Sequence, residues 1–247
     1  MTMKKKSTPK GLTLTGSMPR SGVTIYERNG RLVTRTASSS EKRSNTRSQF
    51  IQRQKMRHTI ALWKTLKYCD TIFTQHQTAY LNFASLATRL PVVFIPRGGI
   101  NEASFLMPGI PVSDGTRPVI SQQLGEVNGI PALLTDLTES DLTFYTKFRL
   151  YTAEQTMAGE MPRVRFSMRE VRWSEMTAVD GGMALVGEEF ADDMKGWALV
   201  RVVGESCSQQ SIVTRCTLYQ QYTTEEALQT AAKSYGGLTR TLIPTPR

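Results

Sequence analysis

Histidine and cysteine are scarce in this sequence, and their spacing suits few catalytic or metal sites. The two histidines, His58 and His76, are 18 positions apart, with no serine, cysteine and aspartate arranged around them as a nucleophile and its base. Cys207 and Cys216 could face one another across two strands, either as a disulfide in an oxidising compartment or as buried free thiols. Neither cysteine has a histidine beside it, so a zinc site is not expected.

Paired acidic residues and paired glycines are the other chemical signals. Glu188-Glu189 and Asp192-Asp193 could act as acid and base or hold a hard cation, yet the same cluster suits a solvated loop or a docking site for a neighbour's basic arm. Gly98-Gly99 and Gly181-Gly182 lack the spacing of phosphate-binding and dinucleotide-binding loops, so we interpret both pairs as turns. The sequence therefore predicts no catalytic residue, no metal ligand and no cofactor.

Charge is distributed unevenly along the chain. Residues 1–67 hold 16 of the 31 lysines and arginines but 2 of the 21 acidic residues, which leaves a net charge of +14 there and −4 over residues 68–247. A segment this basic repels itself, so we expect it to face nucleic acid or to extend onto acidic neighbouring subunits; a solvated tail is the third interpretation. The residues expected to make these contacts are Lys4, Lys5, Lys6, Lys10, Arg20, Arg43, Arg47, Arg53 and Arg57.

The elements that carry these residues indicate an α+β protein. Asn29-Gly30 is a favoured two-residue turn between β-prone runs, so it predicts a β-hairpin over residues 23–36. An isolated hairpin is marginal in water, so it should dock on a sheet or on another subunit. The four expected parts are a basic extended arm with this hairpin over 1–45, a helical segment over 46–95, a β-rich body over 96–222, and a C-terminal helix with a trailing arm over 223–247.

Helix start signals mark two helices in the second part. Thr46-Arg-Ser-Gln49 fits a capping box, and the residues after it place one stripe of side chains on a helix face, basic in its first turns and apolar later. Met56, Ile60 and Trp63 are expected to widen this stripe. A second helix is expected over 78–89, before a short strand over 91–96. The stripe comprises Ile51, Lys55, His58, Leu62, Leu66, Cys69 and Phe73.

From residue 141 onward, short β-prone runs alternate with turn signals, a pattern typical of an antiparallel sandwich or small barrel. Residues 99–140 are rich in glycine and proline and are expected to be loops with short strands. Thr223-Thr-Glu-Glu226 fits a second capping box, and the helix that it opens should stop at Gly236-Gly237. The strands expected in the body cover 142–151, 164–173, 183–189, 197–204 and 211–219.

Membrane and secretion signals are not expected. No run approaches the ~20 apolar residues that a membrane-spanning helix needs, so we predict no membrane insertion. The charged start Met3-Lys-Lys-Lys6 is followed by no apolar core region, so a secretory signal is not predicted either.

Two stretches resemble known sequence patterns. Gly30-Arg-Leu-Val-Thr-Arg35 and the residues from Asn45 to Leu66 resemble uncharacterised proteins of Bacteroidetes and their phages, in which a short hairpin and a basic N-x-x-(S/T)-x-x-Q-x-x-x-R segment precede an amphipathic helix. Asn45, Gln49 and Arg53 fit that segment loosely, and Thr46 stands in place of the usual proline after the asparagine. The C-terminal Tyr222-Thr-Thr-Glu-Glu-Ala-Leu, ending Ser234-Tyr-Gly-Gly-Leu-Thr, is similar to tail or neck proteins of crAss-like phages. The resemblance covers about a third of the chain and implies a virion structural role, such as a ring or collar protein of the tail.

These observations lead to two functional hypotheses. The first is a structural subunit of a large assembly, a phage tail or neck ring component that is assembled in the cytoplasm of a bacterial host and resides in the virion. Its partners would be copies of itself in a ring and other virion proteins. The alternative is a nucleic-acid-binding protein whose basic N-terminal region contacts DNA, although few aromatic residues stand in that region for base stacking. An enzyme is not expected.

Overall fold

The computed structural model divides the chain into two compact units, Met1–Ser44 and Asn45–Arg247. The residues that it describes are 4–8, 11–18, 23–28, 31–36, 46–70, 72–73, 78–97, 103–158 and 161–238.

The first unit contains an antiparallel sheet in the order β1-β2-β3-β4, formed by β1 Lys4–Thr8, β2 Gly11–Met18, β3 Val23–Arg28 and β4 Arg31–Thr36. Strands β3 and β4 pair Arg28 with Arg31 and Tyr26 with Val33, the register that a two-residue turn imposes. The part over residues 1–45 was expected as an extended arm with a hairpin over 23–36; within it, residues 4–8 also pair with residues 11–15, as strands β1 and β2. Alternating leucine and threonine in Leu12-Thr-Leu-Thr15 favour a strand.

The α-helices of the second unit begin as local sequence signals predict. Each begins after a threonine whose side-chain oxygen accepts a hydrogen bond from a backbone N–H three residues on, namely Thr46, Thr78 and Thr224. The third cap lies one residue later than predicted, and Gly236 and Gly237 follow that helix with positive φ angles of 90° and 81°. The helices are α1 Arg47–Leu66, α2 Ala79–Ala87 and α3 Glu225–Ser234, with 3-10 helices η1 Glu139–Asp141, η2 Trp173–Glu175, η3 Glu188–Ala191 and η4 Leu218–Tyr222.

The strands of the second unit pair antiparallel, which confirms a mainly antiparallel β-rich domain. One sheet has the order β10-β11-β7-β6, a second has β13-β12-β8-β9 with β15 beside β12, and β14 pairs with β5. The strands are β5 Pro111–Asp114, β6 Gln122–Val127, β7 Ile130–Thr135, β8 Thr146–Ala158, β9 Met161–Val171, β10 Thr177–Val179, β11 Gly182–Val186, β12 Lys195–Val203, β13 Ser206–Cys207, β14 Gln209–Ser211 and β15 Val213–Thr214.

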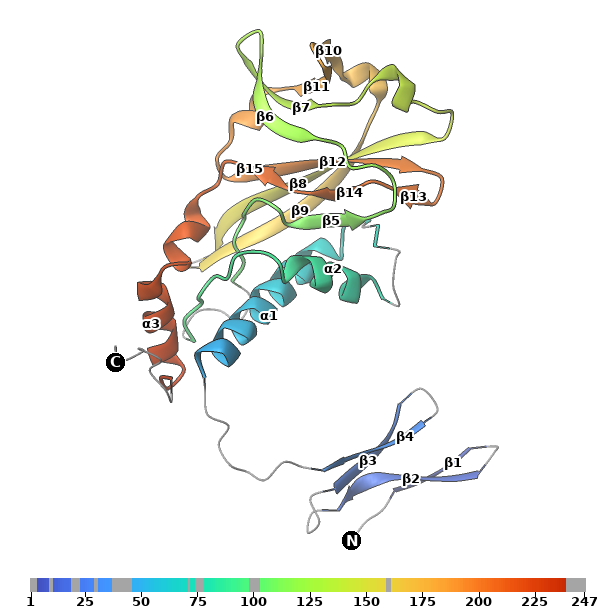
Figure 1. Cartoon of the computed structure of the whole chain (residues 1–247), viewed down its shortest axis with the longest axis vertical. Helices are drawn as coiled ribbons and strands as arrows, with labels where there is room; N and C mark the ends of the chain where they lie inside the picture. Colours follow the sequence, from blue (N-terminus) through green and yellow to red (C-terminus); the bar gives the residue numbers. More distant parts are fainter. Residues whose placement is uncertain are drawn as a thin grey trace, which may run out of the picture. The chain divides into compact units, whose positions relative to one another are not determined.

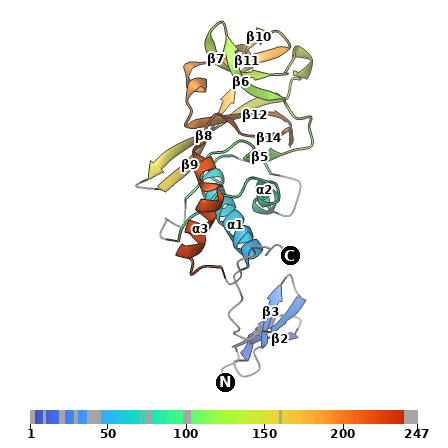
Figure 2. The same ribbon diagram turned by 60° about the vertical axis from the view of Figure 1, so that its left-hand side comes forward.

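Strand β12 separates two apolar cores. Trp197 and Leu199 pack toward the β10-β11-β7-β6 sheet, while Ala198 and Val200 on the other face pack toward α1 and α2. Since both faces are covered, β12 is a nearly continuous run of buried residues and does not alternate. Figures 1 and 2 show the resulting order of layers, with the β10-β11-β7-β6 sheet at one end of this unit and the helices at the other.

Two segments between residues 91 and 135 differ from expectation. Residues 91–96, expected as a strand, contain none, although Phe94 and Ile95 are buried. Their N–H groups donate to the Tyr222 carbonyl at 2.8 Å and to the Gln54 side chain at 3.1 Å, so their partners are not a neighbouring strand. Within the Gly- and Pro-rich stretch, β6 and β7 form a hairpin around Asn128-Gly129, whose φ angles are 53° and 79°.

Candidate binding surface at the basic end

The outer side of helix α1 borders an open groove of about 570 Å³. Residues 46–67, which contain α1, hold six lysines and arginines and no acidic residue. The floor of the groove is largely apolar and includes Phe50, Met56 and Ile60 from α1 together with Tyr235, just after α3. Arg53 and Arg57 line it as well, so an apolar trough carries cationic side chains. The complete lining is Phe50, Gln52, Arg53, Gln54, Met56, Arg57, Ile60 and Tyr235.

Aromatic and cationic contacts join α1 to the residue after α3. Phe50 and Tyr235 meet edge to face with ring centroids 5.7 Å apart, and the Arg57 guanidinium lies 4.5 Å from the Tyr235 ring centroid. Partial burial and then the like charge of Arg97 lower the pKa of Arg57 below its ordinary value. The Tyr235 hydroxyl is buried and has no hydrogen-bond partner among the described residues. Two neighbouring cations and an unsatisfied donor favour an anionic occupant here.

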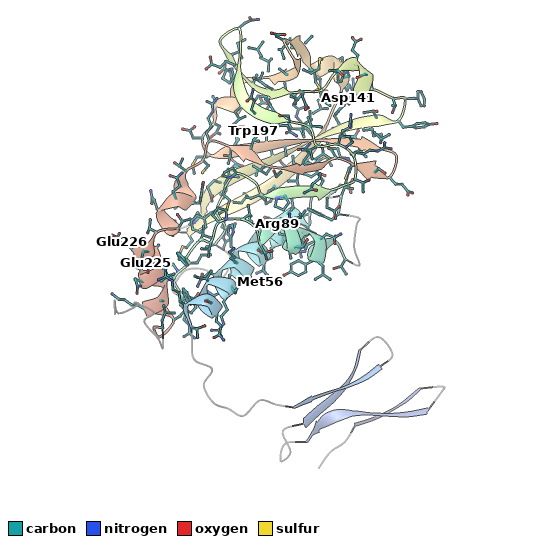
Figure 3. The ribbon with its side chains drawn as sticks, in the orientation of Figure 1. Met56, Arg89, Asp141, Trp197, Glu225 and Glu226 are labelled. Atoms are coloured by element: carbon teal, nitrogen blue, oxygen red, sulfur yellow. The ribbon has the colours of Figure 1, made fainter. Side chains whose placement is uncertain are left out.

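The predicted contact residues fall in different places. Arg53 and Arg57 line the groove, whereas Arg47 makes a two-pronged ion pair with Glu225 at the start of α3, with one N–O distance of 2.9 Å. Glu225 is labelled in Figure 3. Lys4, Lys5 and Lys6 belong to strand β1 of the first unit. Lys10, Arg20 and Arg43 lie outside the described residues.

The expected position of two apolar residues on α1 is wrong. Met56 and Ile60 were expected to widen the buried stripe, but their side chains are 39% and 42% exposed and line the groove. Figure 3 shows Met56 on α1. The buried face of α1 instead includes the polar residues Gln54, His58 and Thr59. The burial of Gln54 and His58 depends on hydrogen bonds from distant backbone N–H groups, which the helical period alone does not reveal.

Gln54 and His58, on the inner face of α1, bind two backbone segments that have no regular secondary structure. The Gln54 Oε1 atom accepts a hydrogen bond from the Ile95 N–H at 3.1 Å, and one turn later the His58 Nε2 atom accepts from the Phe105 N–H at 3.0 Å. Gln155 on β8 continues the set by accepting from the Leu106 N–H at 2.6 Å. These bonds pair buried backbone donors that no strand satisfies. The inner face of α1 is therefore structural, whereas Met56 and Ile60 on its outer face line the groove.

The buried thiols and the imidazole are poorly suited to nucleophilic or acid–base chemistry. Burial lowers the pKa of His58 to about 4, and its Nε2 atom is already engaged by the Phe105 N–H. Burial raises the pKa of Cys207 to about 11 and raises the pKa of Cys216, so neither thiol is a ready thiolate. Cys207 and Cys216 are free cysteines. Across the described residues, no group of three or more His, Cys, Asp or Glu side chains could hold a metal ion.

An acidic surface lies at the opposite end of the same unit. Residues 120–146 and 173–194 hold ten acidic residues and no lysine or arginine, and they form the β10-β11-β7-β6 sheet with η1, η2 and η3. Arg201, Arg169 and Lys195 neutralise Asp141, Glu175 and Asp192, in that order. Within the described part of the chain, no ion pair reaches the exposed Glu126, Glu139, Asp180, Glu188, Glu189 or Asp193. Figure 3 shows Asp141 at this end and Met56 at the other.

The sequence carried a signal for this acidic end that counting charge over residues 68–247 hides. That segment contains both the acidic loops and the lysines and arginines of β8, β9 and β12, so their charges largely cancel and its net charge is only −4. Two stretches without a single basic residue would have marked the acidic surface. Only the sheet pairing shows that the two stretches lie together.

Comparison with known protein families, curated proteins and solved structures finds no match to this chain. The resemblance to phage proteins therefore stays a prediction. Among the described helices, none combines the length and apolar character needed to cross a membrane.

Proposed function

We propose that this protein is a structural subunit of an oligomeric assembly, in which copies associate through unlike surfaces. The observation that carries the proposal is the separation of charge within the unit Asn45–Arg247, with basic α1 at one end and the acidic β10-β11-β7-β6 sheet at the other. A surface of one sign repels its own copy, so contact between identical faces is disfavoured. Contact between unlike faces is favoured, and repetition of such a contact builds a ring when the rotation closes.

The more specific form of this proposal is a ring component of a phage tail or neck. The resemblance of the C-terminal segment to tail and neck proteins supports it, and so does the basic N-terminal unit, which would extend onto adjacent subunits. In this form the protein resides in the virion with copies of itself and other virion proteins. The N-terminal residues proposed to contact neighbours are Lys4, Lys5, Lys6, Lys10, Arg20 and Arg43, joined by Arg47, Arg53 and Arg57 on α1.

Binding of nucleic acid is the second candidate, and the neighbouring guanidinium groups of Arg57 and Arg97 favour it. Like charges held together, with no acidic residue in α1, would suit phosphate groups. The assembly proposal is preferred because the same chain also carries an acidic surface at its other end, which a duplex would repel.

Sedimentation velocity on the full chain tests the proposal. At about 0.15 M salt we expect an oligomer that dissociates at about 1 M, since screening weakens contacts between opposite charges. Glu188→Lys at the acidic end should raise the dissociation constant about fivefold. Glu226→Lys is the matched control: it changes charge equally, but Glu226 lies on α3 at the basic end, labelled in Figure 3, so association should not weaken.

The same runs repeated with duplex DNA separate the two candidates. A protein that stays monomeric but binds DNA, with an affinity that falls by about 0.9 log units per log unit of salt for each phosphate contacted, would favour nucleic-acid binding. A protein that stays monomeric and does not bind DNA at either salt concentration would contradict both the assembly function and nucleic-acid binding.

A further inference from the structure

The loop between η1 and β8 ends in two exposed aromatic side chains. Phe144 is 95% exposed and Tyr145 is 71% exposed, and their rings meet edge to face with centroids 5.2 Å apart. The aromatic rings of Trp197 and Phe190, by contrast, are buried in a core of the same unit. Burial of large apolar side chains is favourable, so this exposed pair marks a surface that gains by contact.

This aromatic tip is held in place by hydrogen bonds at its base. The Thr143 N–H donates to the Thr146 Oγ1 atom at 2.9 Å, and the Thr146 N–H donates to the Thr143 carbonyl at 2.9 Å. On the preceding side, the Asp141 carboxylate accepts from the Thr138 N–H at 2.9 Å and pairs with Arg201 on β12. A tip closed in this way loses little conformational entropy when it binds.

The basic groove has the complementary properties. Its volume of about 570 Å³ can admit aromatic side chains, and its floor of Phe50, Met56, Ile60 and Tyr235 is largely apolar. The tip stands on the acidic end, close in sequence to Glu139, whereas Arg53 and Arg57 line the groove. Apolar and charged partners are thus matched on the two surfaces.

The tip cannot enter the groove of its own chain. The groove lies on α1, and the tip precedes β8 at the acidic end, so the two are at opposite ends of one unit; Figure 3 shows Met56 and Asp141, which mark them. An occupant with the right chemistry is therefore the same loop of a second copy.

We infer that Phe144 and Tyr145 of one copy insert into the α1 groove of the next, forming a head-to-tail contact. This inference rests on the proposed assembly function and names its interface. The contact joins unlike surfaces, so one end of a growing chain of copies has an unused tip and the other end an unused groove. Further copies can therefore add until a ring closes. The Arg57 guanidinium, which lies over the Tyr235 ring, would face the acidic residues around the incoming tip.

Complementary variants of the full chain test this interface by sedimentation velocity. Phe144→Ala combined with Tyr145→Ala removes the tip, and Ile60→Glu places a negative charge in the groove. Each should raise the dissociation constant at least about 30-fold, the effect of losing a central interface residue. All three positions are exposed, so circular dichroism and the melting temperature should stay those of the wild type.

A mixture of the two variants gives the distinguishing result. The tip-deleted variant keeps its groove and the Ile60→Glu variant keeps its tip, so an equal mixture should form dimers and stop there. A symmetric contact through like surfaces would not be restored by mixing. Tyr68→Ala, which removes an exposed aromatic side chain outside the groove, is the control and should assemble as the wild type does.

The failure of this interface can be told apart from the failure of the assembly function. If the wild type forms oligomers and both variants do so equally well, or if the mixture stays monomeric, the tip-in-groove contact is wrong and the assembly function stands. If the wild type is monomeric at every concentration and salt tested, the assembly function and this contact are both overturned.

Discussion

At position 58 the chain keeps a histidine neutral inside the protein. The ring is buried beneath α1, and its Nε2 atom accepts the Phe105 N–H, which requires that this nitrogen carry no proton. Protonation would place an unpaired charge in the core and break the bond to Phe105. A residue that could have served as a base thus serves to fix the backbone around Phe105.

This histidine should make stability depend on pH. Its pKa is about 4 in the folded protein against 6.5 when exposed, so as the pH falls the unfolded chain takes up the proton first. The free energy of unfolding should therefore be constant in this respect above about pH 6.5 and fall by about 3 kcal/mol by pH 4. Urea denaturation followed by fluorescence at intervals across this range measures the slope.

Replacement of the two histidines separates the source of that slope. His58→Gln should lower stability at pH 7 and remove the pH dependence between about 4 and 6.5. His76→Gln is the matched control and should keep the slope. An unchanged slope in His58→Gln would show that another group causes it.

Among the elements, strand β5 ends where the chain passes directly against the backbone of β13. Asp114 ends β5 and Gly115 follows it, and a Cβ atom at Gly115 would lie 1.8 Å from the Cys207 carbonyl oxygen. That carbonyl also accepts the Arg117 N–H at 2.9 Å. The close contact between Gly115 and the Cys207 carbonyl keeps the end of β5 beside β13 and β14, next to the sheet that separates the two cores.

A methyl group at this crossing should be costly. Gly115→Ala must push backbone apart, so we expect stability to fall by about 2–3 kcal/mol, seen as a lower urea midpoint with an unchanged slope. Gly125→Ala on β6 is the control, because its Cβ would meet the Leu134 Cδ1 atom at 2.6 Å, the end of a movable side chain. Equal losses in the two variants would argue against a backbone constraint at Gly115.

Across the whole molecule, basic residues and apolar cores are distributed differently between the two units. Met1–Ser44 carries a large share of the basic residues, while Asn45–Arg247 contains the described apolar cores. Each unit is compact by itself, so we expect the second unit to fold without the first.

Deletion of residues 1–44 tests that division. The remaining unit should melt within about 3 °C of the full chain, since each unit is compact by itself. Its association should weaken, because the basic N-terminal contacts are gone. Calorimetry and sedimentation measure the two effects separately. A large fall in melting temperature would contradict the independence of the units, and unchanged association would remove the N-terminal residues from the proposed interface.

Local signals predicted local structure well. Thr46 and Thr78 start helices and Gly236 follows one, because caps and turns depend on a few neighbouring residues. The Asn128-Gly129 hairpin could have been predicted from the same dipeptide signal as the hairpin at residues 23–36. It was not predicted, because the glycines and prolines around it indicated loops. The strand expected at 91–96 was wrong because its backbone donors meet a side chain and an isolated carbonyl.

By itself, the sequence determined the basic N-terminal segment, the main helices and the antiparallel character of the body, because charge, capping and β-propensity act over short stretches. Only the tertiary structure decided that Gln54 faces inward while Met56 and Ile60 face out, since the buried Gln54 amide needs a partner, the Ile95 N–H, that lies about forty residues away in the sequence. It also brought residues 120–146 and 173–194 together into one acidic end, opposite α1, through strand pairings that no local pattern encodes.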